Sequence, residues 1–204
     1  MAKIKKSPID LSTLELLLSY KYIDNSYKLF WFKSLFYKSL NGAKKITLTD
    51  LAIEMILGAW DLVAVKNITF GRLDKLHRTI EEIESLYHVS PDISKEDLRI
   101  LIENIKDKDI LALIEDLYED TPYQFVEPLY MQKLKGASYN KKKNLIIECT
   151  LSDPFALYQI DSVSHCIVLN NEWITYMKRH QKQIEGVLHD SLAYFLDKHA
   201  VAKR

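Results

Sequence analysis

Few residues in this chain break helices, and few could form disulfides. Its 204 residues include five glycines, five prolines and two cysteines. The scarcity of glycine and proline favours helices joined by short turns. Cys149 and Cys166 form no Cys-x-x-Cys pair, and in a chain long enough to bury a core we expect both to be reduced thiols that pack inside. The composition therefore argues against a disulfide-stapled fold.

The chain also lacks a long hydrophobic run and a net charge. No apolar run reaches the roughly 20 residues of a membrane-spanning helix, and no apolar signal segment follows Met1–Lys6. We therefore expect a cytoplasmic protein with no membrane partner. Its 28 basic and 28 acidic residues cancel, but lysines gather in residues 1–45 and 133–143 while residues 81–120 are acidic. This segregation can attract a polyanion or a basic partner, or it can simply keep helix faces solvated.

No group of residues has the spacing of an active site. The sequence has no glycine-rich phosphate loop and no pair of histidines four residues apart on a helix. The order of His165, Asn171 and His180 mimics a metal-dependent site in which a histidine base is oriented by an asparagine. However, His165 and Asn171 are too close in sequence for such a site, and we expect three surface polar residues. We predict no catalytic residue, no metal ligand and no cofactor in this chain.

Amphipathic helices account for most of the first half of the sequence. From Asn25 to Leu40, apolar residues surround the helix axis almost completely, which predicts a central, buried helix. Asn41 and Gly42 have the residue types of a left-handed helix end. Thr47-Leu-Thr-Asp50 is typical of a capped start for a helix that continues to about Trp60. We expect Trp60 itself to lie at a surface groove.

The remaining pattern predicts more helices and one hairpin. The expected helices are Arg72–Tyr87, a Ser94-capped helix to Ile105, Asp107–Asp120, Glu127–Lys135, Lys142–Leu151 and a long helix from Asn171. Leu157–Asp161 and Cys166–Asn170 are expected to be strands. The predicted fold is mainly α, a multi-helix domain with a small two-stranded β-hairpin before a long C-terminal helix. Thr121-Pro122 predicts a joint between a helical subdomain, 1–120, and a smaller one, 121–204, although the two could form one continuous domain.

The best candidate for a binding site is the basic segment 133–143, which includes the loop expected between the helices Glu127–Lys135 and Lys142–Leu151 and places Tyr139 in that loop. Its five ammonium groups could hold phosphates, and its one aromatic ring could stack on a base. The candidate residues are Lys133, Lys135, Tyr139, Lys141, Lys142 and Lys143. Contacts of this kind give affinity without sequence readout. We predict weak, salt-sensitive DNA binding here, and the alternative is a lysine cluster that binds nothing.

Four blocks of the sequence carry a family resemblance. They are Asn25–Phe32, Phe70–Leu76, Thr121–Pro128 and Asn170–Tyr176. In order and spacing they resemble the N-terminal region of bacterial HNH endonuclease proteins, in which a helical domain precedes a metal-dependent nuclease cassette. The blocks consist mostly of aromatic and packing residues. The sequence ends at Arg204, roughly where that cassette would start.

The resemblance implies a non-catalytic, DNA-associated domain of an HNH-type endonuclease, of the kind found in restriction or phage defence. The family's catalytic residues have no matching positions in this sequence, so none is carried over. A divalent metal ion would be required only if a cassette followed Arg204, and the longer protein would then be a metal-dependent nuclease. The alternative is a protein-interaction or regulatory module without nucleic-acid binding, which would bind a protein partner or a second copy of itself.

Overall fold

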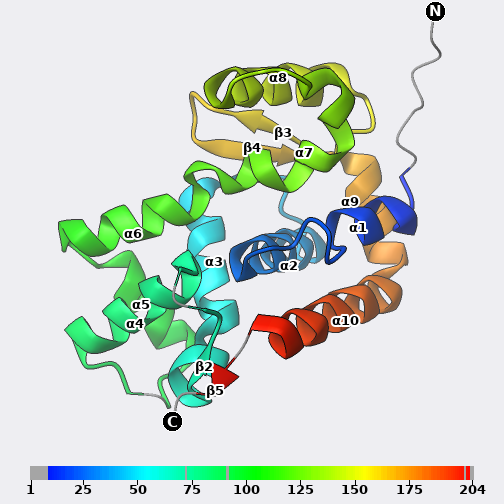
Figure 1. Cartoon of the computed structure of the whole chain (residues 1–204). Helices are drawn as coiled ribbons and strands as arrows, with labels where there is room; N and C mark the ends of the chain where they lie inside the picture. The colour runs from blue at the N-terminus through cyan, green and yellow to red at the C-terminus, as the bar shows by residue number, and fades with distance from the viewer. Residues whose placement is uncertain (1–8, 72, 91, 200, 203–204) are drawn as a thin grey trace, which may run out of the picture.

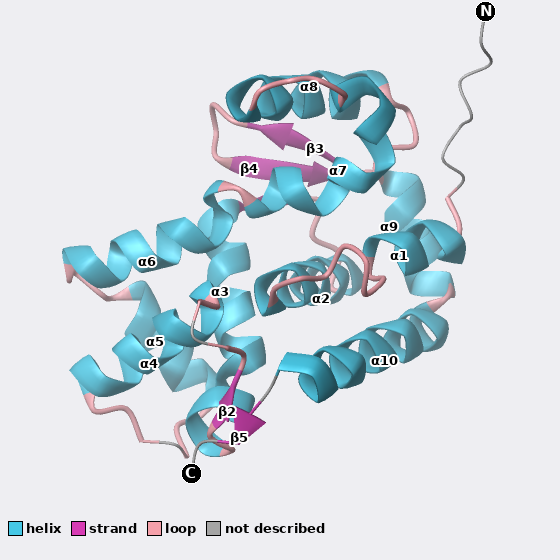
Figure 2. Ribbon diagram, viewed as in Figure 1, coloured by secondary structure: helices cyan, strands magenta, loops and turns pink. Residues whose placement is uncertain are grey.

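The computed structural model describes residues 9–71, 73–90, 92–199 and 201–202. Within these residues the fold is mainly α-helical with a small antiparallel sheet, as predicted (Figure 1, Figure 2). The elements in chain order are α1 (Leu11–Leu17), α2 (Ser26–Leu40), β1 (Lys45–Thr47), α3 (Leu48–Trp60), the π-helical turn η1 (Asp61–Val65), β2 (Ile68–Thr69), α4 (Lys75–Tyr87), α5 (Lys95–Glu103), α6 (Lys108–Glu119), α7 (Thr121–Leu134), α8 (Tyr139–Ser152), β3 (Tyr158–Asp161), β4 (Cys166–Leu169), α9 (Asn171–Arg179), α10 (Gln181–His199) and β5 (Val201–Ala202).

Helix α2 lies at the centre of the fold, as its sequence predicts. Trp31, Phe32 and Phe36 are fully buried at 0% exposure. The helix contacts α3, α7, α9 and α10, which surround it in Figure 1. A helix that is apolar on nearly every side is stable only when neighbours cover all of those sides. The aromatic run of α2 is therefore core and not a binding surface.

Several helices begin where the sequence predicts a cap. The Thr47 hydroxyl accepts a hydrogen bond from the amide of Asp50 at 3.1 Å, and the Ser94 hydroxyl accepts one from Asp97 at 3.1 Å. Such bonds satisfy amides of the first helical turn that have no partner within the helix. Helix α4 begins at Lys75, later than the predicted Arg72, which lies outside the described residues.

One buried carboxylate caps two helices. Asp74, which is 4% exposed, accepts a hydrogen bond from the amide of His77 at 3.0 Å and so caps α4. The same carboxylate accepts bonds from the amide and the hydroxyl of Ser26, at 2.8 and 2.7 Å, at the start of α2. Burial raises the pKa of Asp74, and these hydrogen bonds oppose that effect. Asp74 therefore joins the N-termini of α2 and α4.

The small sheet has three strands, one more than the predicted hairpin. Strands β3 and β4 pair antiparallel, with Tyr158 opposite Leu169 and Asp161 opposite Cys166, which confirms the hairpin. Strand β1 adds to the other edge of β4, giving the order β1-β4-β3. With only three residues, β1 is too short to show the period-2 pattern by which strands are recognised. A second, separate pair joins β2 to β5.

The C-terminal half differs from prediction in three places. The long helix expected from Asn171 is divided at His180 into α9 and α10, and both parts pack on α2. Helix α7 begins at Thr121 and not at Glu127, with a proline in its first turn, where the missing amide costs nothing. Helix α7 ends at Leu134, close to the predicted Lys135, but α8 starts at Tyr139 and not near Lys142, so Tyr139 and Lys141 are helical and not in a loop.

The buried side chains on both sides of Thr121 belong to one hydrophobic cluster. The rings of Phe32 and Phe125 stack at 5.7 Å, and those of Trp31 and Tyr158 meet edge to face at 6.3 Å. Trp60 is 2% exposed, so its predicted place at a surface groove is wrong. Cys149 and Cys166 lie buried as free thiols. None of the helices in the described residues is both long and apolar enough to cross a membrane.

Candidate functional site

The basic segment lies where α7 turns into α8. Lys133 is in the last turn of α7, Lys135 follows that helix, and Lys141 is in the first turn of α8. Gly136 has a φ of 79°, a left-handed conformation that glycine adopts without strain and that reverses the chain here. All three lysines are exposed, and none forms an ion pair with another described residue. Three of the five predicted cations are thus available to a ligand.

Lys142 and Lys143 are engaged with carboxylates. The Lys142 ammonium lies 2.8 Å from Glu127 of α7. The Lys143 ammonium pairs with Asp120 and lies 3.9 Å from Glu119. These two lysines fasten α8 to the α6–α7 corner, so they are less able to neutralise a bound phosphate.

Tyr139 takes part in the same fastening. The Lys143 ammonium lies 5.3 Å from the centre of the Tyr139 ring and 5.4 Å from that of Tyr123, within range of cation–π attraction. Partial burial and a hydrogen bond to Asp120 raise the pKa of the Tyr139 hydroxyl. Burial alone would raise the pKa of Asp120, but bonds from Lys143 and Tyr139 outweigh it and hold that pKa below its usual value. Even so, Tyr139 remains 52% exposed, so a planar group can reach its ring.

The N-terminus of α8 adds partial positive charge to the three free lysines. Its cap residue, Ser138, makes no side-chain capping bond, and the first turn contains no acidic residue. The first amides of a helix lack intrahelical partners and carry the positive end of the helix dipole. We call Lys133, Lys135, Lys141 and this N-terminus the basic end.

A cavity of about 320 Å³ lies beside the basic end, between α7, α8 and the start of α2. Three tyrosines line it: Tyr27, Tyr123 and Tyr139. The Tyr27 hydroxyl donates a hydrogen bond to Gln124 at 3.3 Å, and burial, followed by nearby carboxylates, raises its pKa to about 12. The cavity gives the basic end an aromatic border whose hydroxyls remain protonated at neutral pH.

The three residues that mimic a metal site in sequence lie in different local settings. His165 is exposed in the β3–β4 turn with a φ of 47°, and Asn171 is the first residue of α9. The His180 ring stacks on Tyr176 at 4.3 Å, and its Nδ1 lies 2.8 Å from the side-chain oxygen of Gln183. Across the residues that the structure describes, no three His, Cys, Asp or Glu side chains form a group that could hold a metal ion.

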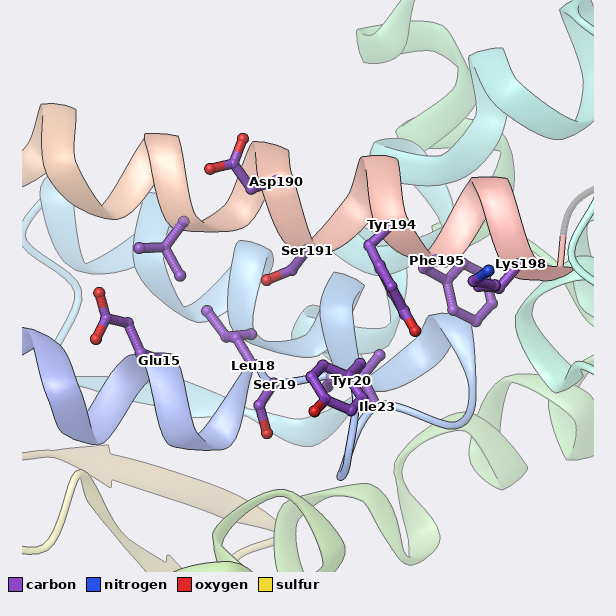
Figure 3. Close-up of a pocket in the computed structure, with 11 residues that line it drawn as sticks. Glu15, Leu18, Ser19, Tyr20, Ile23, Asp190, Ser191, Tyr194, Phe195 and Lys198 are labelled. Carbon is purple, nitrogen blue, oxygen red and sulfur yellow. The ribbon is translucent and has the colours of Figure 1, made fainter.

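A larger groove, of about 640 Å³, lies between α1 and α10, and no sequence pattern predicts it (Figure 3). Leu18, Ile23 and Phe195 provide its apolar lining. The rings of Tyr20 and Tyr194 lie 5.5 Å apart along it and are 74% and 46% exposed. We call this the tyrosine groove. Its walls come from opposite ends of the chain, so no local pattern could have predicted it.

Charged residues stand at both ends of the tyrosine groove. Figure 3 shows Glu15 and Asp190 toward one end and Lys198 toward the other. Acidic and basic groups separated in this way give the groove a direction that a bound segment would have to match.

No protein-family model, curated protein or solved structure matches this chain. The resemblance to HNH endonucleases therefore stays a hypothesis that rests on the four sequence blocks. Within the fold, residues of these blocks have structural roles. Phe70 stacks on Phe30 at 5.9 Å and meets Phe195 edge to face at 6.0 Å, and Asp74 caps two helices. The fold is a mainly α-helical domain, and the basic end is a cationic surface on it.

Proposed function

We propose that this chain is a non-catalytic, DNA-associated domain that holds a nucleic-acid backbone at its basic end. The observation that carries the proposal is the placement of Lys133, Lys135 and Lys141, which are exposed and free of ion pairs among the described residues, around the N-terminus of α8. Each ammonium that contacts a phosphate releases a condensed counterion, which drives binding. A helix N-terminus attracts phosphate oxygens for the same electrostatic reason.

The preferred ligand is single-stranded DNA. Tyr139 is 52% exposed beside the three lysines, and an aromatic ring stacks on an unpaired base whatever its identity. Contacts to phosphates and stacking explain affinity without sequence preference. From the resemblance we further propose a bacterial, cytoplasmic protein of restriction or phage defence, and a metal-dependent nuclease activity for any longer protein that carries the cassette.

Fluorescence anisotropy with a short labelled oligothymidylate at low salt tests the proposal. The test variant changes Lys133, Lys135 and Lys141 to Glu. The matched control changes Lys66, Lys106 and Lys182 to Glu, because these lysines are also exposed but lie outside α7, α8 and the turn between them. Both variants alter the net charge equally. We expect the test variant to lose binding and the control to retain most of it.

Two results would count against this function. Equal loss in both variants would show that overall charge, and not the basic end, attracts the DNA. If the wild-type chain fails to bind even at low salt, DNA association is wrong and the second candidate takes its place.

The second candidate is a protein-interaction module, and the tyrosine groove favours it. Two exposed tyrosines above an apolar lining have the composition of a binding hot spot. Glu15 and Asp190 lie toward one end of the groove, and Lys198 lies toward the other (Figure 3). Two copies related by a twofold axis could therefore pair acid with base at both ends. The partner that this arrangement fits is a second copy of the chain.

Sedimentation equilibrium tests this second candidate. A mass that rises with protein concentration, and that returns to the monomer value when Tyr20 and Tyr194 are changed to Ser, would support it. A monomer at every concentration would remove self-association as the function of the groove.

A further inference from the structure

The three-tyrosine cavity beside the basic end has aromatic walls and balanced charges. Its volume of about 320 Å³ is at the lower limit of ligand sites in proteins, so it has room for one small group. Each of the three lysines that line it pairs with a carboxylate. The pairs are Lys28 with Asp24 at 2.6 Å, Lys142 with Glu127 at 2.8 Å, and Lys143 with Asp120. A charged ligand would have to compete with one of these ion pairs, whereas a neutral ligand would not.

Gln124 of α7 lines the same cavity with a side-chain amide. Asn25 donates a hydrogen bond to the Tyr27 hydroxyl at 3.2 Å, and that hydroxyl donates its one proton to the side-chain oxygen of Gln124 at 3.3 Å. Burial and a hydrogen bond to Asp120 raise the pKa of Tyr139, and a hydrogen bond from Gln124 opposes them. The Gln124 nitrogen is therefore the donor to Tyr139, and the two tyrosines hold the amide in one orientation.

Held in this way, the Gln124 amide keeps one donor and one acceptor for a ligand. A side-chain amide has two N–H groups and two acceptor lone pairs, and the two tyrosines engage one of each. The group that fits this cavity is therefore neutral and small, with an aromatic face for the tyrosine rings and neighbouring donor and acceptor atoms at its edge.

A nucleobase has all of these properties. The Watson–Crick edge of each of the four bases carries a donor next to an acceptor, and in duplex DNA the opposite strand occupies that edge. Tyr139 borders the cavity, and Lys141 of the basic end follows it within the first turn of α8. A strand whose phosphates lie at the basic end thus has a base within reach of the cavity.

We propose that this cavity receives one unpaired base of the bound strand and that Gln124 forms hydrogen bonds with the donor and acceptor at the edge of that base. The inference rests on the proposed function, since the basic end holds the phosphates. Because every unpaired base has such an edge, the contact selects single-stranded over double-stranded DNA without preferring a sequence. Gln124 and Tyr139 are already held by their hydrogen bonds, so little conformational entropy is lost when the base enters.

Two oligomers of equal length test the proposal: oligothymidylate, and the same backbone with difluorotoluene in place of every thymine. Difluorotoluene has the shape of thymine but hardly forms hydrogen bonds, so both oligomers offer the same phosphates and a ring that can stack. Fluorescence anisotropy at low salt should show that the wild-type chain binds the difluorotoluene oligomer roughly tenfold more weakly, which corresponds to the loss of two neutral hydrogen bonds. Equal affinities would overturn the proposal. They would leave the proposed function in place if changing Lys133, Lys135 and Lys141 to Glu abolished both.

Gln124→Met tests the assigned residue, because it removes the amide and keeps a side chain of similar length. This variant should bind oligothymidylate roughly tenfold more weakly than wild type does and should bind the difluorotoluene oligomer equally well. The matched control is Gln132→Met, the same substitution at an exposed position of α7, which should bind both oligomers as wild type does.

Duplex DNA of the same length provides a readout that damage to the fold would alter. Wild type and Gln124→Met should bind it equally, because its base edges are already paired. A Gln124→Met variant that still prefers thymine, or that loses as much affinity for duplex as for single strands, would overturn the proposal. If the wild-type chain binds neither oligomer, the proposed function fails and this inference fails with it.

Discussion

Replacing Asp74 with Ala should destabilise the fold more than the loss of any ordinary helix cap. The carboxylate accepts three hydrogen bonds, one from His77 of α4 and two from Ser26 of α2. Loss of a side-chain cap costs about 1 kcal/mol for each helix. The Ser26 hydroxyl, in a residue that is 0% exposed, would also lose its acceptor, and an unsatisfied buried donor costs about 1–3 kcal/mol. Removing the carboxylate also removes the cost of burying its charge, which offsets part of this sum. We therefore expect the free energy of unfolding to fall by about 3 kcal/mol.

Asp107→Ala is the matched control. Asp107 caps only α6, accepting bonds from the amides of Asp109 and Ile110 at 3.0 Å. Its loss should cost about 1 kcal/mol. Asp74→Asn should fall between the two, because the amide oxygen still accepts hydrogen bonds whereas the amide nitrogen does not.

Urea unfolding followed by circular dichroism measures these differences as shifts in the midpoint at constant slope. The expected order of stability is wild type, Asp107→Ala, Asp74→Asn and then Asp74→Ala. If Asp74→Ala is no less stable than Asp107→Ala, the carboxylate does not join α2 to α4 in solution, and the argument from its double cap fails.

Three further predictions concern the core, a helix and alkaline pH. Trp31→Ala and Trp60→Ala should each cost about 3–5 kcal/mol, because both side chains are buried; a Trp60→Ala variant that melts like wild type would contradict this. Gly186→Ala should stabilise α10 by about 0.5–1 kcal/mol, because an added Cβ meets no atom within 4 Å, and a lowered melting temperature would refute it. Burial raises the pKa of Tyr27 from 10.0 to about 12, so the folded state keeps a proton that the unfolded chain loses, and stability should fall as pH rises through that window. Tyr27→Phe should reduce the steepness of this fall in pH-dependent melts, and an unchanged profile would show that Tyr27 does not cause it.

The parts of the fold that depend on local signals could be predicted from the sequence. The central helix α2 follows from an apolar surface on all sides, and the start of α3 follows from the residue types that cap it. The β3–β4 hairpin joins neighbouring segments, so its pairing is also local.

The parts that depend on distant contacts could not. Strand β1 exists because Thr47 pairs with Cys166, far along the chain. No glycine or proline marks the break at His180. We attribute the break to packing, since both α9 and α10 pack on α2. The burial of Trp60 likewise depends on neighbours that its own helix does not reveal.

The candidate site shows the same division. Composition was enough to locate a cluster of lysines and a tyrosine in residues 133–143. Which of them are free depends on how α8 packs against α7, since that contact pairs Lys142 with Glu127 and Lys143 with Asp120. The tyrosine groove lies between elements from opposite ends of the chain and could not be predicted.

The salt dependence of binding to single-stranded DNA tests the proposed function most directly. If Lys133, Lys135 and Lys141 are the contacts, the logarithm of the association constant should fall with the logarithm of salt concentration at a slope of about −2, since each phosphate contact on a single strand contributes about −0.7. A slope near −3.5, the value for about five contacts, would show that Lys142 and Lys143 leave their carboxylates to bind DNA. No binding at low salt, or binding that salt does not weaken, would contradict DNA association at the basic end.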